Sequence, residues 1–473
     1  MSENKFCPFP SQTPMELEGQ CTHPHNIHYM ASFYSKAKED ILHASKHSEL
    51  LVQGSVDRPL IGLGHQWQPS YNSECWKVAF APDESSFAWI HDRRKVSIIP
   101  WNRSQHCPVY QNTQDSKGDI LNDNSDTVTI EALSPVVSVA FGCGKDYKGS
   151  ASQTSETEGC GQGNISGLKT ENVTQGYWRR FNFRQGLILA TGHQNGRILI
   201  WDAHTGQLCV KLLDHKYSVT DLAFAPDGSL RLASASMDKT LKLWDLEDDG
   251  NMFKTLTGKH QGVVLGCCWS PDASMLASVC QPKEAIIWNA NDNYKVQCRL
   301  EGHQNTVVAA QFTPDSALLA TASFDSRVIL WDTHTGKVVR ILFHLHPPPR
   351  PIFASGANGA WVHGVSFSRD GNYLATVADD GFVRFWNLLG GIDPEAIAVQ
   401  EDEMLSCQFS PSGTSLAVSS AKGNVVFYGI SQEVPSLLHL SRVATRQKFS
   451  ADEVDLCEIP IRLKAYLKYE CWV

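Results

Sequence analysis

Short apolar runs alternate with polar turn residues along most of this chain, and the alternation returns at a nearly constant interval. The segments 189–202, 232–245, 319–332 and 374–387 read LATGHQNGRILIWD, LASASMDKTLKLWD, LATASFDSRVILWD and LATVADDGFVRFWN. Each segment holds two apolar runs of strand length separated by a polar turn, which is typical of an antiparallel hairpin. The pattern therefore predicts an all-β fold built from repeated meanders of short strands.

Aromatic residues end the repeats and set their period. These residues are Trp101, Trp201, Trp244, Trp288, Trp331, Trp386 and Tyr428. From Trp201 to Trp331 the interval is 43 or 44 residues. One meander cannot bury both of its faces, whereas a ring of such sheets buries them and leaves only short edges. We predict a seven-bladed propeller over residues 58–430, closed by an outer strand at 58–63 from the N-terminal side.

The composition of each repeat resembles that of the WD40 repeat, with Gly-His near the start and Trp-Asp at the end. The resemblance implies a buried network in which a histidine bridges an aspartate and a hydroxyl, and the hydroxyl accepts the indole N–H. Such a network stiffens a blade when every member is satisfied. We expect the third and fifth copies to be stiffest, because they contain the complete sets His215, Ser234, Asp238, Trp244 and His303, Thr321, Asp325, Trp331.

The other copies are incomplete. The fourth has His260 and Ser278 but carries Pro282 where aspartate is expected, and the second has Asn195 at that position. Because the histidines recur with the blade, we interpret them as structural. The chain also lacks GxxxxGK[ST], GxSxG and HExxH, so we expect no catalytic residue, cofactor or metal site.

Several segments depart from the repeat. Residues 1–57 form an N-terminal extension, predicted to be partly disordered with a short helix at 31–51. The long interval from Trp101 to Trp201 assigns an extra loop to blade two, with strands at 127–133, 136–142 and 186–192. The stretch 143–175 within it is rich in Gly, Ser and Thr and is predicted to be disordered. The aromatic and arginine-rich segment 177–186 is interpreted as an entry to the blade rather than a nucleic-acid site.

The pattern changes after Tyr428. SLLHLSRVATR (436–446) places Leu437, Leu440 or Ser441, and Ala444 or Thr445 on one helical face. Residues 451–469 begin acidic, pass through Pro460 and resume at helical spacing. We predict two or three short amphipathic helices in residues 433–473. So small a piece buries little apolar surface alone, so we expect its apolar face to meet a partner.

This tail resembles a SOCS box, through Ser436, Leu437, Leu440 and Arg442 in its first part and Ile459, Pro460, Leu463, Tyr466 and Leu467 in its second. A propeller followed by such a tail is similar to the WD repeat and SOCS box-containing family. The resemblance implies that the tail binds Elongin B/C through Leu437, Leu440, Ser441 and Thr445. It also implies that the tail binds a cullin, expected to be cullin-5 with its RING protein, through Ile459, Pro460, Leu463 and Leu467. The propeller would present a target protein for ubiquitination and proteasomal degradation.

The tail departs from the family pattern at three positions. Ser441 replaces the usual cysteine, Thr445 replaces an aliphatic residue, and Glu458 replaces a proline. A buried hydroxyl without a partner costs about 1–3 kcal/mol, so we expect a weakened Elongin C site. The alternative is a propeller scaffold with a degenerate SOCS box and no ligase role. A cullin-4 receptor is disfavoured because no Trp-Asp-x-Arg occurs.

Charge and cysteine usage limit the remaining classes. The chain carries 41 basic and 50 acidic side chains, a net charge of −9, which argues against general nucleic-acid binding. The N-terminus shows no secretory signal pattern, and no apolar run is long enough to span a bilayer. The 14 cysteines are scattered without C-x-x-C. We therefore expect free thiols in a reducing compartment, either the cytoplasm or the nucleus.

Overall fold

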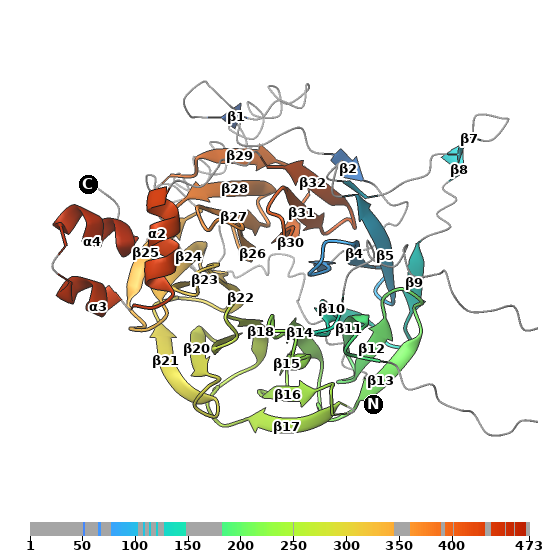
Figure 1. Cartoon of the computed structure of the whole chain (residues 1–473). Helices are drawn as coiled ribbons and strands as arrows, with labels where there is room; N and C mark the ends of the chain where they lie inside the picture. Colours follow the sequence, from blue (N-terminus) through green and yellow to red (C-terminus); the bar gives the residue numbers. More distant parts are fainter. Residues whose placement is uncertain are drawn as a thin grey trace, which may run out of the picture. The chain divides into compact units, whose positions relative to one another are not determined.

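Among the residues that the structure describes, a ring of seven antiparallel sheets is followed by three short helices (Figure 1). The computed structural model describes residues 51–52, 65–67, 77–102, 107–108, 113–114, 120–121, 127–147, 182–248, 250–344, 360–388, 393–400, 402–430, 437–449, 451–457 and 459–469. Met1–Val52 and Gln53–Val473 are separate compact units. Within the first, only strand β1 (Leu51–Val52) is described. The predicted helix at 31–51 lies outside the described residues, apart from Leu51.

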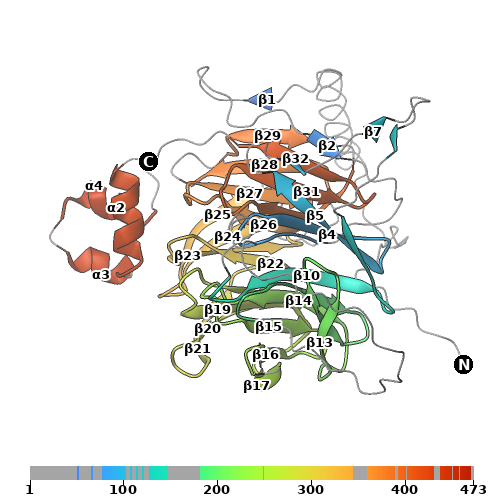
Figure 2. The ribbon, with the colours of Figure 1, turned by 45° about the vertical axis from the view of Figure 1, so that its right-hand side comes forward.

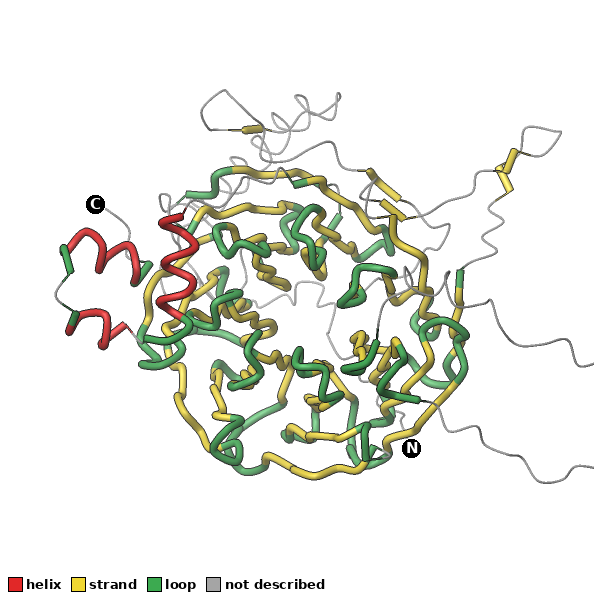
Figure 3. Tube along the Cα trace, viewed as in Figure 1, coloured by secondary structure: helices red, strands yellow, loops and turns green. Residues whose placement is uncertain are grey.

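The second unit confirms the prediction of a seven-bladed propeller, whose strands Figure 3 traces around the ring. Blade one contains β3 (Val78–Phe80), β4 (Ser86–His91), β5 (Lys95–Asn102) and β9 (Val128–Glu131). Blade two contains β10 (Val136–Cys143), β11 (Leu187–His193), β12 (Ile198–Asp202) and β13 (Leu208–Leu212). Blade three contains β14 (Val219–Phe224), β15 (Arg231–Ser236), β16 (Leu241–Asp245) and β17 (Asn251–Leu256). Blade four contains β18 (Val264–Trp269), β19 (Met275–Cys280), β20 (Glu284–Asn289) and β21 (Lys295–Glu301). Blade five contains β22 (Val307–Phe312), β23 (Leu318–Ser323), β24 (Arg327–Asp332) and β25 (Val338–Phe343). Blade six contains β26 (Val362–Phe367), β27 (Tyr373–Ala378), β28 (Phe382–Asn387) and β29 (Ala396–Val399). Blade seven contains β30 (Met404–Phe409), β31 (Ser415–Ser420) and β32 (Val425–Gly429).

An N-terminal strand completes the last blade. Strand β2 (His65–Trp67) pairs antiparallel with β32, His65 opposite Phe427 and Trp67 opposite Val425. The predicted closing strand at 58–63 lies outside the described residues. The described strand that closes the ring therefore begins a few residues later in the chain, but it comes from the expected side.

The extra chain that the sequence assigns to blade two is divided between two blades. Strand β9 pairs with β5 and so forms the outer strand of blade one. Residues 102–126 therefore interrupt blade one, where β6 (Cys107–Pro108) also pairs with β5, and β7 (Thr113–Gln114) pairs with β8 (Ile120–Leu121). The assignment to blade two alone was wrong, because a repeat that ends on its tryptophan includes the outer strand of the preceding blade. Of the predicted disordered stretch 143–175, only residues 143–147 are described.

Tryptophans hold neighbouring blades together. Trp288, Trp331 and Trp386 are buried, and each belongs to a core cluster with aliphatic residues of the preceding blade. Neighbouring blades approach closely: a Cβ added to Gly142 in β10 would lie 2.8 Å from the ring of Phe224 in β14. Apolar burial of this kind contributes about 25 cal/mol per Å² removed from water. The tryptophan that marks the period of the sequence is therefore also the side chain that packs one blade against its neighbour.

The third blade contains the full polar network. His215 Nδ1 lies 2.8 Å from Asp238 Oδ2, and Nε2 lies 2.7 Å from Ser234 Oγ. The indole of Trp244 donates to the same hydroxyl at 2.9 Å. The network links the loop before the inner strand to the two middle strands, so it fixes the register of the blade.

The fifth blade repeats this arrangement. His303 Nδ1 lies 2.9 Å from Asp325 Oδ2, and Nε2 lies 2.7 Å from Thr321 Oγ1. Trp331 donates its indole N–H to Thr321 at 2.8 Å. Asp325 is fully buried and also accepts the backbone N–H groups of Gln304 and Arg327.

Three helices follow the last blade. They are α2 (Leu437–Arg446), α3 (Ala451–Leu456) and α4 (Ile461–Leu467), and α4 contacts both of the others. Figure 2 shows them as a group beside the strands of the ring. None of the helices in the described part of the chain is long and apolar enough to cross a membrane.

Candidate functional site

One face of helix α2 is polar yet buried. His439, Arg442 and Arg446 follow each other at intervals of three and four residues, which places them on one side of the helix. Their exposed fractions are 3%, 0% and 1%. Two fully buried arginines on a ten-residue helix are unusual, because an arginine is rarely buried without a partner. Their partners lie on the propeller.

Arg446 forms a buried ion pair with blade five. Its Nη2 donates to Asp332 Oδ2 at 2.6 Å, and both side chains are almost fully buried. Asp332 follows the repeat tryptophan Trp331 and also accepts the backbone N–H of Thr335 in the turn after β24. Burial alone would raise the pKa of Asp332, but the Thr335 hydrogen bond and the charge of Arg446 hold that pKa below its ordinary value.

Arg442 is enclosed by tail and propeller together. Its guanidinium lies 4.1 Å from the ring centre of Tyr469 and 5.0 Å from that of Tyr466, within the range of cation–π attraction. Its Nη2 donates to His439 Nδ1 at 2.8 Å and to Asn372 Oδ1 of blade six at 3.3 Å. Burial, and then the positive charge of Arg442, lower the pKa of His439, so the imidazole is neutral and can accept this bond.

Tyr469 forms a third anchor at the end of α4. Its backbone adopts the left-handed region with φ 60°, which ends the helix. The phenol donates a short hydrogen bond to the buried carboxylate of Asp315, between β22 and β23. Burial and then the charge of Asp315 raise the pKa of Tyr469 well above its ordinary value, so the donor proton is retained. The tail is therefore held at both of its longer helices.

The opposite face of α2 points to solvent. Leu440 is 50% exposed, and Ser441 and Ala444 are exposed. Thr445 is half-buried, and its hydroxyl donates to the backbone oxygen of Ser441 at 2.7 Å. The side chain of Leu437 is outside what the structure describes. The outward face of α2 therefore presents the apolar side chain of Leu440 beside the hydroxyls of Ser441 and Thr445.

Comparison with known proteins connects this arrangement to a family. The family model of the WD domain, G-beta repeat, matches residues 206–245, 250–289, 294–332 and 349–387. WD repeat and SOCS box-containing protein 1 of Homo sapiens is 45% identical over 410 residues, covering 84% of this chain and 91% of that protein. The Mus musculus protein of the same name is 42% identical over 455 residues, covering 93% and 100%.

The chain belongs to the WD repeat and SOCS box-containing family. The propeller carries the WD repeats of this family, and the helical tail is the segment in which the sequence predicts its SOCS box. The resemblance read from the sequence is thus confirmed at the level of family and fold.

The predicted contact residues of the second SOCS-box segment are not all accessible. Pro460 is exposed, Ile459 and Leu463 are half-buried, and Leu467 is buried at 6% exposure. Leu467 therefore lies in the interior of the tail rather than on a surface. The most exposed apolar residues of the segment are instead Leu456 at 85% and Ile461 at 82%. Sequence spacing missed them because Leu456 is the last residue of α3 and Ile461 the first of α4, so neither belongs to the apolar positions spaced along α4.

The sequence pattern also did not predict the buried residues that anchor the tail to the propeller, which are Arg442, Arg446 and Tyr469. The sequence matches Arg442 to the SOCS-box pattern but indicates no role for Arg446 or Tyr469. The one available signal is the spacing of His439, Arg442 and Arg446 along a single helix face. A charged stripe is usually solvated, so the spacing alone did not indicate burial.

An aromatic cluster lies where blades five and six meet. Phe324, directly after β23, stacks on Trp361 with ring centres 4.9 Å apart and contacts His363 at 5.3 Å. Trp361 donates its backbone N–H to Asp379 Oδ1 at 2.7 Å. Burial, supplemented by the charges of Asp380 and Glu403, raises the pKa of Asp379 to about 7 against the opposing Trp361 hydrogen bond.

Asp379→Asn is expected to stabilise the propeller at pH 8 but hardly at pH 4. A carboxyl whose pKa is about 7 folded and 3.8 unfolded binds its proton more tightly in the folded state. The contribution of this carboxyl to the stability of the folded state therefore turns unfavourable as the pH rises from about 4 to about 7. Asparagine removes that contribution and keeps an oxygen that can accept the backbone N–H of Trp361. Urea unfolding of both proteins at several pH values would check this, and a gain that does not vary with pH would contradict it.

Proposed function

We propose that this protein is a substrate receptor of an Elongin–cullin–SOCS-box E3 ubiquitin ligase. The propeller binds a target protein, the SOCS box binds Elongin B/C and a cullin, expected to be cullin-5, and partner proteins carry out ubiquitin transfer. The protein itself acts as a non-catalytic adaptor. The proposal is supported chiefly by the two faces of α2, of which one is buried against the propeller and the other presents Leu440, Ser441 and Thr445 outward.

The hydroxyls at the Elongin face are compatible with binding. An unpartnered hydroxyl would cost about 1–3 kcal/mol on burial, but Thr445 already donates to the Ser441 carbonyl. Leucines buried in an interface contribute about 1.5–3 kcal/mol each. Elongin C binding is therefore expected to survive both departures from the family pattern, at reduced affinity.

Leu437→Asp or Leu440→Asp in the full-length protein is expected to weaken Elongin B/C binding about 100-fold or more. Each change removes a leucine's burial and brings a carboxylate into an apolar contact. Titration calorimetry with purified Elongin B/C measures the effect. Leu213→Asp, which changes a 63% exposed leucine on the propeller, is the matched control and should bind like the wild type. Equal binding by all three variants would refute the docking site.

The double variant Ser441→Cys, Thr445→Ile is expected to bind Elongin B/C about 10-fold more tightly than the wild type. It replaces two hydroxyls by apolar groups, worth roughly 1.4 kcal/mol together if Thr445 is already satisfied. The same titration checks it. A wild-type protein and a double variant that both fail to bind would favour the propeller scaffold with a degenerate SOCS box.

A further inference from the structure

The fourth blade has only part of the polar network that its neighbours contain in full. His260 Nε2 lies 2.8 Å from Ser278 Oγ, and Trp288 donates to the same hydroxyl at 2.8 Å. The aspartate that would accept from Nδ1 is replaced by Pro282. His260 is 93% buried, since its exposed fraction is 7%, and its Nδ1 has no hydrogen-bond partner among the described residues.

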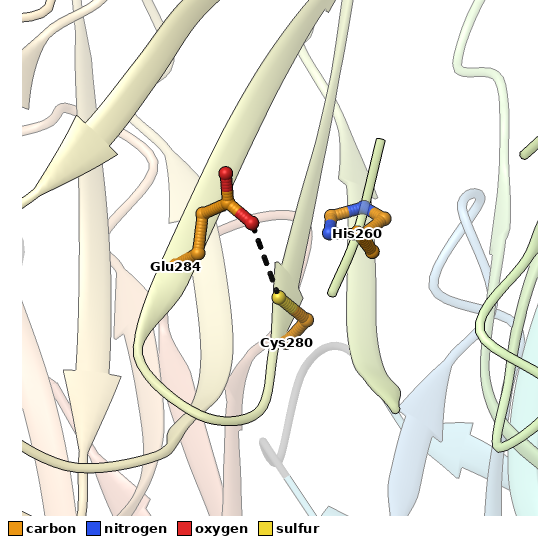
Figure 4. A group of neighbouring side chains, drawn as sticks. All are labelled: His260, Cys280 and Glu284. Atoms are coloured by element: carbon orange, nitrogen blue, oxygen red, sulfur yellow. Dashed lines mark hydrogen bonds between the residues drawn. The ribbon is translucent and has the colours of Figure 1, made fainter. Parts of the chain in front are cut away.

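Two further substitutions in the same copy surround this nitrogen. Cys280 and Glu284 stand where the third blade has Ser236 and Thr240. Cys280 ends β19, Glu284 begins β20, and the two are paired across the turn, which brings their side chains together on one face. The Cys280 sulfur lies 3.9 Å from Glu284 Oε2. Figure 4 shows His260 turned toward both.

The three side chains form a compact donor set. One ligand atom from each of His260, Cys280 and Glu284 lies within 4.8 Å of the other two. Donor atoms of a tetrahedral zinc ion stand about 3.3–3.8 Å apart, given Zn–S and Zn–N or Zn–O bonds of about 2.3 and 2.0–2.2 Å. Movements of about 1 Å would therefore close the three donors around one ion.

We propose that His260 Nδ1, Cys280 Sγ and Glu284 form a binding site for a thiophilic divalent cation of the zinc type. An imidazole, a thiolate and a carboxylate are the ligand classes that Zn²⁺ takes in proteins, and a water from solvent completes four-coordination. On binding, the S–H bond of Cys280 breaks, its proton leaves to solvent, and the sulfur lone pair forms the bond to the metal. No oxidation or reduction is involved.

The polar surroundings position the other two ligands, while burial and then the charge of Glu284 raise the pKa of the Cys280 thiol to about 12, so that metal binding has to displace this proton. Burial and then the charge of Arg299 lower the pKa of His260 to about 4, so the ring is neutral and its Nδ1 can hold a lone pair. Arg299 forms an ion pair with the second oxygen of Glu284 and also donates to the backbone oxygen of Lys259. A partner of this kind orients a ligating carboxylate, and its loss typically costs 10- to 100-fold in metal affinity. Glu284, with 13% of its side chain exposed, gives a route to solvent.

The test uses the full-length protein stripped of metal by chelator dialysis and titrated with Co²⁺ and Zn²⁺. Cobalt bound to a thiolate gives a sulfur-to-metal charge-transfer absorption, which reports the Cys280 bond directly. We expect Cys280→Ser to lose this absorption together with about one bound ion per chain. Cys457→Ser, which changes an exposed thiol in α3, should retain both. Because the comparison is a difference between variants, ions bound by other cysteines do not affect it.

Two further variants keep the test decisive if Cys280→Ser folds poorly. Glu284→Gln and Arg299→Gln leave the thiol in place and are expected to weaken Co²⁺ binding, Arg299→Gln by about 10- to 100-fold. Zn²⁺ should also raise the melting temperature of the wild type but not of Glu284→Gln, because ligand binding to the folded state stabilises it. Unchanged cobalt spectra and zinc-induced melting shifts in these variants would overturn the proposal, as would a wild type that shows no thiolate absorption.

Discussion

Asp325→Ala is expected to lower the free energy of unfolding of the propeller by about 3–5 kcal/mol. The buried carboxylate accepts hydrogen bonds from His303 Nδ1 at 2.9 Å and from the backbone N–H groups of Gln304 and Arg327 at 2.8 and 3.1 Å. Hydrogen bonds to a charged group contribute about 1.5–3 kcal/mol each, and a buried donor left unpaired is costly. Alanine would remove all three acceptor contacts at a site that water does not reach.

Urea unfolding of the purified protein measures this effect. Asp292→Ala is the matched control, because Asp292 forms an exposed ion pair with Lys295 at 2.9 Å. Exposed pairs contribute about 0–1 kcal/mol, so the control should differ little from the wild type. If the two variants unfold at the same urea concentration, the His303 network does not stabilise blade five in the way its geometry indicates.

The repeat made the ring predictable from the sequence. The tryptophans recur at an interval that equals one four-stranded sheet, and the polar residues around them recur with the same interval. A pattern repeated seven times averages out local ambiguity, so blade number and closure from the N-terminal side followed. The division into blades was harder, because the repeat in the sequence is offset by one strand from the sheet in space. That offset is why β9 was assigned to the wrong blade.

The tail was less predictable because its partners are distant in the sequence. Arg446 pairs with a residue 114 positions earlier, and Tyr469 with one 154 positions earlier. Helical periodicity shows which residues share a face but not which face is buried. The family resemblance implied that Leu467 contacts a cullin, yet Leu467 is buried, whereas the stripe of His439, Arg442 and Arg446 lies against the propeller. The outward orientation of Leu440 and Ser441 follows only once those arginines are placed.

Removing the Arg446 charge is expected to loosen the attachment of the helical tail to the propeller without unfolding the ring. Arg446→Met keeps most of the aliphatic stem but leaves Asp332 buried without its cation. Breaking one side of a buried pair typically costs about 3–5 kcal/mol. The ring should persist, because Asp332 still accepts the Thr335 N–H in its own turn. Amide hydrogen exchange should therefore accelerate in α2 and α4 while the strands of blade five keep their protection.

A second ion pair between the same two parts provides the control. Lys337 and Asp452 lie 3.5 Å apart with side chains 74% and 64% exposed, so Lys337→Ala should change exchange in α2 very little. Equal protection of α2 in the wild type and in Arg446→Met would mean that the buried pair does not hold the tail.

The Arg446→Met variant also tests whether binding of Elongin B/C by the tail is independent of how the tail is placed on the propeller. Arg446 lies on the buried face of α2, whereas Leu440 and Ser441 lie on the exposed face, so Arg446→Met should bind Elongin B/C with nearly wild-type affinity. Under the proposed function, a target on the propeller would then be held less rigidly relative to the ligase. Because orientation of reacting groups contributes strongly to rate, ubiquitination of a propeller-bound target should slow while Elongin binding persists. If both fall together, the arginine supports the fold of the SOCS box itself and not its placement.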